Sequence, residues 1–498
     1  MVFSLVKDSG LFATAKLINV ISAFIIFGYI ARNFNPESLG KIDFISTLIV
    51  FIVNTAIFGQ GSSLGRLIND PIEVKEKRIL ATNSLILQLA ALFIMLGLLV
   101  ITDNYFSIDK FIFNNSHALK SVVLIQIPFV LATEICLGAL LWNRFQKFFA
   151  LITILSSLSS CVFLVITFEI FKIDITILNV FRVYLVARSL VAAISIHFCI
   201  KQRIFSSIKS IDFAKMNDLL KIAIPLGLLT GVGTILPLWQ RVLIKSYLQE
   251  YNLGLFALSA KIVSVITVLG ASFNNAWGPI YIKSYQEKDI KRIFIFVFKS
   301  IGYICSIIIL LISINAADLV KILGDSNYNS ASLLILPLSI GLCLEILQHV
   351  TEIGIFISKK SFYYLISYLL FVLCFTIVFM LSVKHFGFIS IGWSLAISYL
   401  VKTIFMTLLS QRFYKVNWPY NSIMLTMGTS IGFSYMYYIN LFTSTSTFLI
   451  LIISISLVTY FFISNLSNYE LVLIKSVPKI FYKKLCDIKD SYNSKDKN

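Results

Sequence analysis

The sequence is poor in charged residues. Only 13% of its 498 positions are Asp, Glu, Lys or Arg, whereas 58% are hydrophobic. A soluble domain usually carries about 25% charged residues. A soluble protein with so little charge could not cover its own surface with polar groups. The composition therefore excludes an ordinary soluble enzyme and a disordered chain, and it indicates a protein that lies mostly within a membrane.

The motifs of common catalytic and nucleotide-binding sites are also missing. The chain has no GxxxxGK[ST] phosphate loop, no HExxH zinc motif and no GxGxxG dinucleotide motif. One GxSxG match at 61–65 ends an apolar run instead of joining a strand to a helix, so it predicts no serine nucleophile. We therefore expect no catalytic residue, no cofactor and no enzymatic activity within this chain.

Cysteines are few and scattered, and none forms a CxxC pair. We interpret them as small buried hydrophobic residues, and we expect neither a disulfide framework nor a metal site. The seven are Cys136, Cys161, Cys199, Cys305, Cys343, Cys374 and Cys486.

Long apolar runs fill most of the chain. A membrane-spanning helix needs about 20 apolar residues, and no run shows the alternation of a barrel strand. The first run is longer than the apolar part of a secretory signal, so we interpret it as a span. The sequence predicts an all-α polytopic membrane protein with about 14 transmembrane helices, at 11–31, 42–64, 79–101, 120–141, 149–168, 177–200, 219–244, 255–277, 293–314, 331–357, 362–383, 388–409, 421–441 and 448–465.

Positive charge is concentrated in alternate loops. The chain has 42 Lys and Arg against 24 Asp and Glu, a formal net charge of +18. With the N-terminus inside, the inside segments hold 27 Lys and Arg and the outside segments hold 8. This asymmetry fits the positive-inside rule with both termini cytoplasmic. The basic tail after the last span either lies along anionic lipid or is solvated.

Two segments resemble each other in sequence and in position. Residues 36–48 read PESLGKIDFISTL and residues 250–262 read EYNLGLFALSAKI, with Leu39/Leu253 and Gly40/Gly254 identical. Each segment is a short outside turn that leads into a new span, and the two are six spans apart. Six is even, so both units enter the membrane in the same direction. We therefore predict a parallel repeat about an axis along the membrane normal.

The sequence resembles the polysaccharide-unit (O-antigen type) flippases of the multidrug/oligosaccharidyl-lipid/polysaccharide exporter superfamily. The resemblance is carried by the opening YIARNFNPESLGKIDFIST, by KIAIPLGLLTGVGTILPLWQRVLIKSYLQEYNLGLFALSAKI and by Trp277-Gly278-Pro279. Family members often have an acidic residue where this chain has Gln240, so we assume no proton-coupling role at that position.

The resemblance implies a fold and a function. Two six-helix bundles, 1–210 and 211–410, would form a V of the kind found in multidrug exporters of the superfamily, with helices 13 and 14 at 411–469 and a basic cytoplasmic tail at 470–498. The implied protein is a transporter of the bacterial inner membrane. It would move undecaprenyl-pyrophosphate-linked oligosaccharide units, precursors of O-antigen or capsule, from the cytoplasmic to the periplasmic leaflet by alternating access. Its candidate partners are the polymerase and chain-length proteins of the same pathway, and no nucleic acid is expected.

Cationic residues within the apolar runs are candidates for substrate binding. A charge in hydrocarbon costs at least about 2.5 kcal/mol, so each needs a reason to be there. A cavity with Lys and Arg would replace the water around a diphosphate while the polyprenyl chain stays in lipid. Alternatively, these side chains reach the interface or pair with buried acids. The cationic candidates are Lys16, Arg182, Arg188, Arg241 and Lys261.

Acidic residues within the runs form a second set. Glu345, His349 and Glu352 have the spacing i, i+4, i+7 and share one helix face. Two carboxylates and an imidazole at low dielectric can hold a proton near neutral pH. The set therefore serves either ion coupling or charge compensation. Asp43 and Glu134 complete it.

Pro225 and Pro237 lie in one predicted span, with three glycines between them. Proline breaks the helical hydrogen-bond ladder, so we expect a kinked helix that acts as a hinge, or a static kink.

Two rival functions are a drug/cation antiporter, which needs an acidic cavity, and a membrane glycosyltransferase or polysaccharide polymerase. The polymerase would need a large outside loop, whereas the longest one here, 102–119, has only four acidic or basic residues: Asp103, Asp109, Lys110 and His117.

Overall fold

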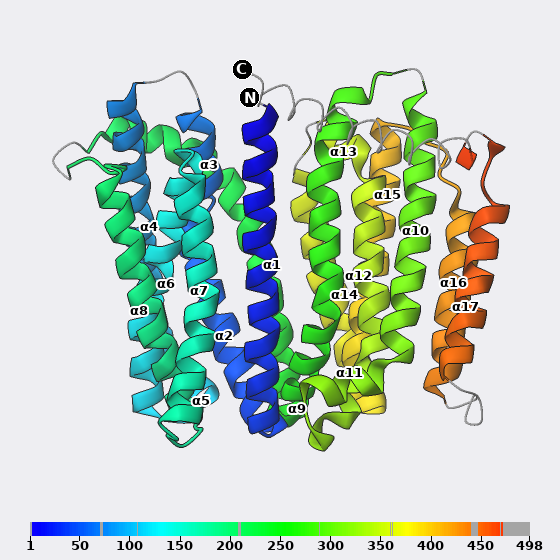
Figure 1. The fold of residues 1–498 in the computed structure, drawn as a ribbon, viewed down its shortest axis with the longest axis horizontal. Coiled ribbons are helices and arrows are strands. Elements are labelled where there is room, and N and C mark those ends of the chain that lie inside the picture. Colours follow the sequence, from blue (N-terminus) through cyan, green and yellow to red (C-terminus); the bar gives the residue numbers. More distant parts are fainter. Residues whose placement is uncertain are drawn as a thin grey trace, which may run out of the picture. The chain divides into compact units, whose positions relative to one another are not determined.

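A computed structural model describes residues 2–69, 73–106, 108–207, 211–287, 289–358, 360, 362–439, 447–468 and 470–471. Helices account for nearly all of this part of the chain, and no β-strand occurs in it. The expected all-α fold is confirmed (Figure 1). Cys486 and nearly all of the predicted basic tail lie outside the described residues.

The first half of the chain forms long helices joined by short turns (Figure 1). A single π-helical turn, Ile166–Ile170, extends the seventh helix. The helices are α1 (Val2–Asn33), α2 (Pro36–Ile57), α3 (Gln60–Ile68), α4 (Val74–Phe106), α5 (Ile108–Phe113), α6 (His117–Trp142), α7 (Gln146–Val165) and α8 (Ile177–Lys201).

The second half follows the same pattern, with short helices α11 and α13 between the long ones. Its helices are α9 (Phe213–Ser284), α10 (Ile290–Ile314), α11 (Ala316–Leu323), α12 (Ser332–Thr351), α13 (Ile353–Ile357), α14 (Phe362–Phe386), α15 (Ser390–Phe413), α16 (Tyr420–Tyr438) and α17 (Thr447–Ser464).

Eleven helical stretches in the described residues are long and apolar enough to cross a membrane. Two of them, Phe213–Ile282 and Phe362–Phe413, each contain two of the predicted spans. The predicted span at 421–441 falls on α16, which is not among the eleven. The multi-span architecture is therefore confirmed, and the count of 14 stays a prediction.

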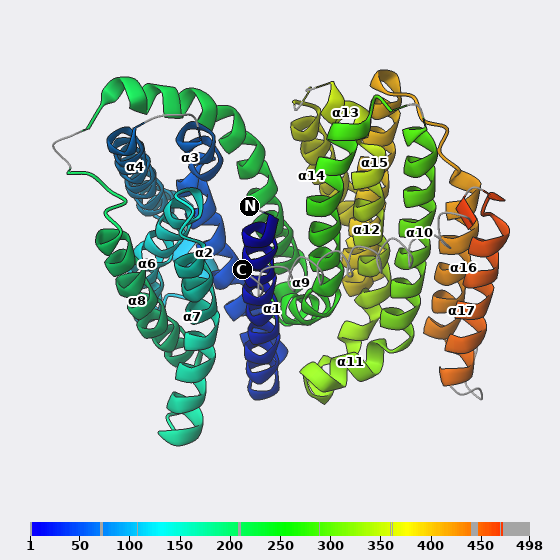
Figure 2. The ribbon, with the colours of Figure 1, turned by 45° about the horizontal axis from the view of Figure 1, so that its top comes forward.

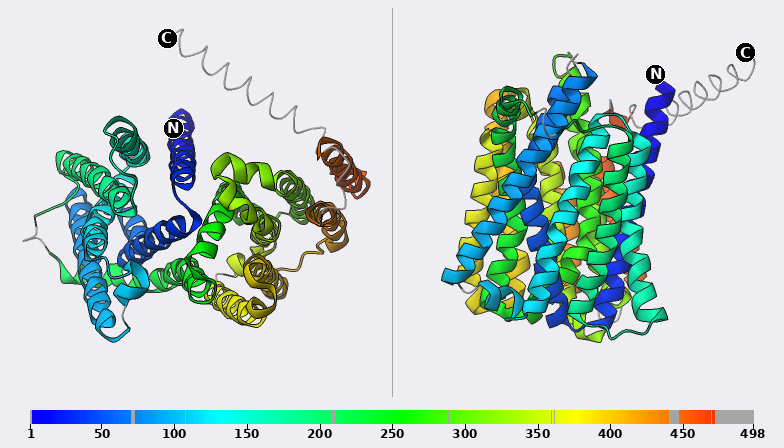
Figure 3. Two further views of the ribbon diagram at one scale, coloured as in Figure 1. Left: turned by 90° about the horizontal axis from the view of Figure 1, so that it is seen from below. Right: turned by 90° about the vertical axis from the view of Figure 1, so that its left-hand side faces the viewer.

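The chain divides into two compact units. Unit 1 comprises Met1–Ile262, Ala317–Leu334 and Phe362–Ser394, and unit 2 comprises Val263–Ala316, Ile335–Ser361 and Leu395–Asn498. In unit 1, α6 packs on α8, α1 packs on α7, and the long helices run roughly parallel (Figure 3). The division of the chain at 210 and 410 stays a prediction.

Side-chain caps fix the helix ends that matter for the site. Asn35 caps α2 by accepting a hydrogen bond from the Ser38 N–H at 2.9 Å, and Pro36 occupies the first turn, where its missing N–H costs nothing. Thr176 caps α8 in the same way at 3.2 Å. These caps set the residues at which α2 and α8 begin. They thereby help to fix the positions of Asp43 and Arg188 along the two helices.

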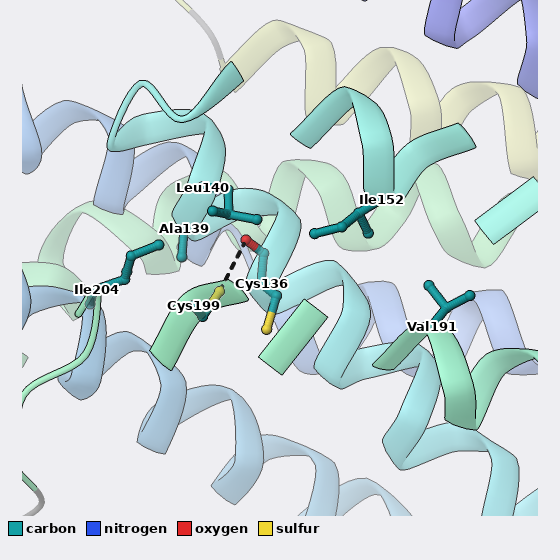
Figure 4. Close-up of a cluster of buried hydrophobic side chains, with 8 residues drawn as sticks. Cys136, Ala139, Leu140, Ile152, Val191, Cys199 and Ile204 are labelled. Atoms are coloured by element: carbon teal, nitrogen blue, oxygen red, sulfur yellow. Dashed lines mark hydrogen bonds between the residues drawn. The ribbon is translucent and has the colours of Figure 1, made fainter. Parts of the chain in front are cut away.

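Two cysteines of unit 1 are buried, as predicted for small hydrophobic residues, whereas Cys161 and Cys374 are half-buried. Cys136 and Cys199 are buried in a cluster with Leu140, Ile152 and Val191 (Figure 4). Their sulfurs form no disulfide, and the Cys199 thiol points to the Cys136 carbonyl oxygen at 3.9 Å. No group of metal-binding side chains occurs in the part of the chain that the structure describes.

Helix α9 contains both predicted spans 7 and 8 and turns at Gln249, whose φ of 68° is left-handed. Its backbone stays helical through Pro225 and Pro237, and its first part is bent (Figure 2). The first part of this helix touches the corner between α2 and α3, because a methyl group on Gly227 would lie 2.8 Å from the Phe58 ring. The kink at Pro225 and Pro237, and movement there, stay predictions.

Candidate functional site

A polar cavity of about 260 Å³ lies inside unit 1, between α1, α2, α7 and α8. Apolar residues such as Ile26, Phe27 and Ile42 form part of its wall. The polar wall is a mixture of hydroxyl groups, an amide and two opposite charges: Asn19, Asp43, Ser46, Ser156, Ser157, Ser160, Tyr184 and Arg188.

Arg188 is the cation that lines this cavity. Its guanidinium carbon lies 5.4 Å from the centre of the Tyr184 ring, an arrangement of the cation–π type. Its Nη1 atom is buried and has no hydrogen-bond partner among the described residues. A buried donor without a partner is costly, and an anion that accepts from it would remove that cost. Arg188 therefore has free capacity to bind an anionic group.

Asp43 is bound to Arg241. The Arg241 Nε lies 2.6 Å from Asp43 Oδ2, and Nη2 donates to Oδ1 at 3.2 Å. This two-point geometry is the strongest that the two groups can form. Arg241 Nη1 also donates to the Pro237 carbonyl at 3.1 Å, one turn back in α9. Arg241 is therefore committed to the protein, and Asp43 presents to the cavity as one half of an ion pair.

Lys261 lies beside the cavity rather than in its wall. Its ammonium group is 4.6 Å from the centre of the Phe24 ring and 5.7 Å from that of Phe27, which does line the cavity. Arg188 is part of the cavity wall. Lys261 and Arg241 lie outside that wall and add positive charge near it.

The other two expected cations are elsewhere. Lys16 on α1 is exposed and does not line the cavity. Arg182 on α8 is exposed and donates to the Asn179 side-chain oxygen at 3.2 Å. Unit 1 therefore brings together Asp43, Arg188, Arg241 and Lys261, and it does not place Lys16 or Arg182 with them.

The acidic set of unit 2 is split between two partners. Glu345 lies 2.9 Å from the Lys402 ammonium, and the Lys402 side chain is only 3% exposed. Glu352 accepts from the Gln348 amide at 2.9 Å and lies 3.1 Å from His349 Nδ1. Glu352 stands at the break between α12 and α13. Each carboxylate thus has its own set of polar partners, and the choice between ion coupling and charge compensation stays a prediction.

Glu134 on α6 is exposed and lines none of the described cavities. Gln240 is buried in unit 1. Tyr184 and the α7 serines also line the cavity, although they are not among the predicted site residues. A signal for the serines was present, because the run Ser156-Ser157-Leu158-Ser159-Ser160 is unusually polar for a membrane helix.

The chain matches a known protein family in sequence and several solved structures in fold. Residues 5–285 match the family described as "Polysaccharide biosynthesis protein". A structure of the lipid II flippase MurJ in an inward closed conformation is similar over 96% of this chain and 99% of that chain, with 17% identity and a TM-score of 0.63.

Multidrug transporters of the MATE family have a similar fold. An inward-facing structure from the MOP superfamily matches 80% of this chain and 94% of its own length, with 16% identity and a TM-score of 0.63. An outward-facing structure matches 82% and 95%, with 14% identity and a TM-score of 0.58. None of the curated protein sequences compared matches the chain.

Proposed function

The chain belongs to the polysaccharide biosynthesis protein family, and from this premise we propose that it is a flippase for undecaprenyl-pyrophosphate-linked oligosaccharide units. The glycan would be a precursor of O-antigen or capsule. The protein would carry it from the cytoplasmic to the periplasmic leaflet of a bacterial inner membrane, with both chain termini in the cytoplasm.

The observation that carries this proposal is the cavity around Arg188. A diphosphate needs cationic hydrogen-bond donors to replace its water, and Arg188 has a buried donor atom without a described partner. The hydroxyl groups of Ser156, Ser157 and Ser160 on α7 donate to backbone carbonyls of their own helix, and their oxygens can still accept hydrogen bonds from the hydroxyl groups of a sugar. The polyprenyl chain would stay in lipid.

Transport requires the site to face each side of the membrane in turn. In the proposed mechanism two six-helix bundles alternate in opening, and α9 bends further at Pro225 and Pro237. Lys16 and Arg182 would meet the diphosphate in a conformation other than this one. The chain-length and polymerase proteins of the pathway would receive the product on the outer side.

The main rival function is that of a drug/cation antiporter, whose substrate would be a cation. Asp43 is the one acidic residue in the described cavity wall, and it is already paired with Arg241. A cation would also face the unpaired Arg188, so the charge of the cavity favours an anion. A polymerase or glycosyltransferase would need a large outside loop with catalytic residues, and the longest predicted outside loop, 102–119, is short.

A proteoliposome assay tests the proposal. An undecaprenyl-diphosphate-linked oligosaccharide is incorporated on one side, and its appearance on the other is followed with a glycan-cleaving enzyme added outside. We expect flipping by the wild-type protein and a loss of about tenfold or more in Arg188→Gln. Lys172→Gln, which removes an exposed cation after α7, is the control and should retain activity. Wild-type protein that moves an organic cation but no glycan lipid would refute the proposal.

A deletion strain gives an independent test. Loss of a flippase should accumulate a complete repeat unit on its carrier at the inner leaflet, whereas loss of a polymerase should leave single units displayed outside. Lipid extraction with and without a membrane-impermeant glycosidase separates the two outcomes.

A further inference from the structure

A second charged site lies at one end of unit 1, where α4 begins and α6 and α8 end. Two adjacent cavities of about 520 and 510 Å³ are present there, and Arg78 and Arg203 line both. Lys75, Lys77 and Arg144 complete the charged wall, and neither cavity has an acidic residue in its described wall. We call these five side chains the basic cluster. It is separate from the cavity around Arg188, with which it shares no wall residue.

The basic cluster is not neutralised by the protein. None of its five side chains forms an ion pair with another described residue. The nearby Glu76 carboxylate instead lies 2.7 Å from the Lys215 ammonium. Like charges gathered in a partly enclosed space repel one another, and a bound anion would relieve that repulsion. The charge of the cluster therefore favours an anionic ligand.

Helices α6 and α8 end next to the basic cluster, and both end with the same backbone hydrogen-bond motif. The Phe145 N–H bonds to the Leu140 carbonyl at 2.9 Å, and the Ile204 N–H bonds to the Cys199 carbonyl at 3.1 Å. These are the six-to-one bonds of a Schellman motif. Leu140, Cys199 and Ile204 belong to one buried core cluster (Figure 4). Phe145 packs against that cluster.

In both motifs the residue before the closing N–H is an arginine in a left-handed conformation. Arg144 has a φ of 63° and Arg203 has a φ of 49°. Glycine is the preferred residue at this position, because a side chain there is strained. Glycine would therefore close both helices at lower cost than arginine does. Two arginines at the strained position, both lining the same cavity, indicate that their side chains have a use beyond ending the helices.

The walls of the cavities also contain exposed apolar side chains. Ile200 lines one cavity and is 68% exposed, and Val74 lines the other and is 64% exposed. Inorganic phosphate would gain nothing from contact with these apolar side chains, whereas the hydrocarbon chain of a lipid would pack against them. Basic pockets at the cytoplasmic ends of transmembrane helices suit the phosphates of anionic lipids in this way.

We propose that the basic cluster binds the phosphate of an anionic lipid, with Arg144 and Arg203 as its principal donors. The lipid is either a phospholipid of the surrounding bilayer or a polyprenyl diphosphate, and both present the same phosphate chemistry above an apolar chain. Ile200 and Val74 contact the first part of that chain. The site would hold a lipid at the membrane surface, at the end of unit 1 that carries the most positive loops.

Full-length protein in nanodiscs of a zwitterionic phospholipid tests this site. The affinity for phosphatidylglycerol, for undecaprenyl diphosphate and for inorganic pyrophosphate is measured by native mass spectrometry or thermophoresis. We expect at least one of the two lipids to bind, and Arg144→Gly and Arg203→Gly to weaken that binding by about tenfold each. Their unfolding temperatures should equal or exceed that of the wild type, because glycine relieves the left-handed strain. The lipid that responds to these variants identifies the source of the phosphate.

Lys172→Gly is the matched control. Lys172 also has a left-handed φ, of 50°, and is exposed, but it follows the opposite end of α7. It should keep the wild-type lipid affinity. Arg78→Gln, a change within a helix, provides a second variant that involves no backbone strain and should also lose affinity. Unchanged lipid binding in the cluster variants, an equal loss in Lys172→Gly, or pyrophosphate binding as tight as that of both lipids would overturn the proposal.

Discussion

Gly40 and Gly254 meet backbone to backbone. A methyl group on Gly40 would overlap the Glu250 carbonyl oxygen and lie 2.9 Å from the Gly254 nitrogen. A methyl group on Gly254 would overlap the Pro36 carbonyl oxygen. In the predicted repeat Pro36 is equivalent to Glu250 and Gly40 to Gly254, so the two contacts are reciprocal. Reciprocal contacts of this kind are produced by a two-fold axis.

A second pair of contacts follows the same pattern. Arg32, at the end of α1, donates to the Ile322 carbonyl in α11 at 2.6 Å. Lys245, just before the turn of α9, donates to the Phe111 carbonyl in α5. Each half of the repeat thus uses a cation at the end of its first span to hold the short helix of the other half.

We expect Gly254→Ala to destabilise the protein by about 2–3 kcal/mol, because the new methyl group meets a backbone atom that cannot turn away. Gly40→Ala should have a comparable effect. The midpoint of thermal unfolding in detergent measures both. Gly138→Ala in α6 is the control, since nothing lies within 4 Å of its added methyl group and alanine favours a helix. Equal stability of all three variants would mean that the glycine contact is not tight.

Much of the fold could be predicted from the sequence, because hydrocarbon imposes simple rules. Every buried backbone group must bond within its own helix, so run length and loop charge suffice to place the helices. The pair Gly40 and Gly254 was also detectable, because close backbone approach admits only glycine and leaves an identity at both positions of the repeat.

The pairing of charges could not be predicted. Asp43 and Arg241 are 198 residues apart, and Glu345 and Lys402 are 57 apart, so only packing brings them together. Arg188 and Arg182 lie on one helix with similar surroundings in the sequence, yet only the first lines the cavity. The left-handed conformation of Arg144 and Arg203 could not be predicted from the sequence, because the residue in that conformation after a helix is usually glycine.

Asp43→Asn should release Arg241 and make the cavity more positive. The two side chains are 17% and 13% exposed, so loss of the pair should cost about 2 kcal/mol of stability, below the cost for a fully buried pair. At the same time the affinity for pyrophosphate should rise, because the guanidinium is no longer neutralised. Thermal unfolding and pyrophosphate titration of the two proteins provide the measurement. A fall in both stability and affinity would show that Asp43 itself helps to hold the anion.

The pair of Glu345 and Lys402 in unit 2 should behave as a buried ion pair. Glu345→Gln removes the carboxylate that lies 2.9 Å from the Lys402 ammonium, and we expect a loss of about 3 kcal/mol. The double variant Glu345→Leu with Lys402→Met removes both charges and should recover most of that stability. Unfolding midpoints of the three proteins decide the matter, and a double variant less stable than the single one would contradict this account.

Glu352 and His349 are the residues on which ion coupling would depend. If they carry the coupling proton, Glu352→Gln should still flip glycan lipid down its concentration gradient but should no longer respond to an imposed proton gradient. Proteoliposomes with and without an inward pH step measure the response. Transport that keeps its gradient sensitivity in Glu352→Gln and in Glu345→Gln would assign these acids to charge compensation instead.

Glu470 joins the end of α17 to α10 and should make stability depend on pH. Its carboxylate accepts from the Lys299 ammonium at 2.9 Å and from the Ser467 N–H at 2.6 Å. Burial alone would raise the pKa of Glu470, but the Ser467 N–H and the Lys299 ammonium together hold that pKa below its ordinary value. An unfolded glutamate has a pKa of about 4.3.

The folded state therefore favours the charged form of Glu470, and its contribution to stability is present above about pH 4.3. The contribution disappears as the pH falls through the lower pKa of the folded protein. We expect Glu470→Gln to unfold at a lower temperature than the wild type at pH 7, and the difference to shrink below about pH 4. Thermal unfolding of both proteins between pH 3 and pH 7 tests this. A difference that stays constant over that range would mean that Glu470 acts through packing rather than through its charge.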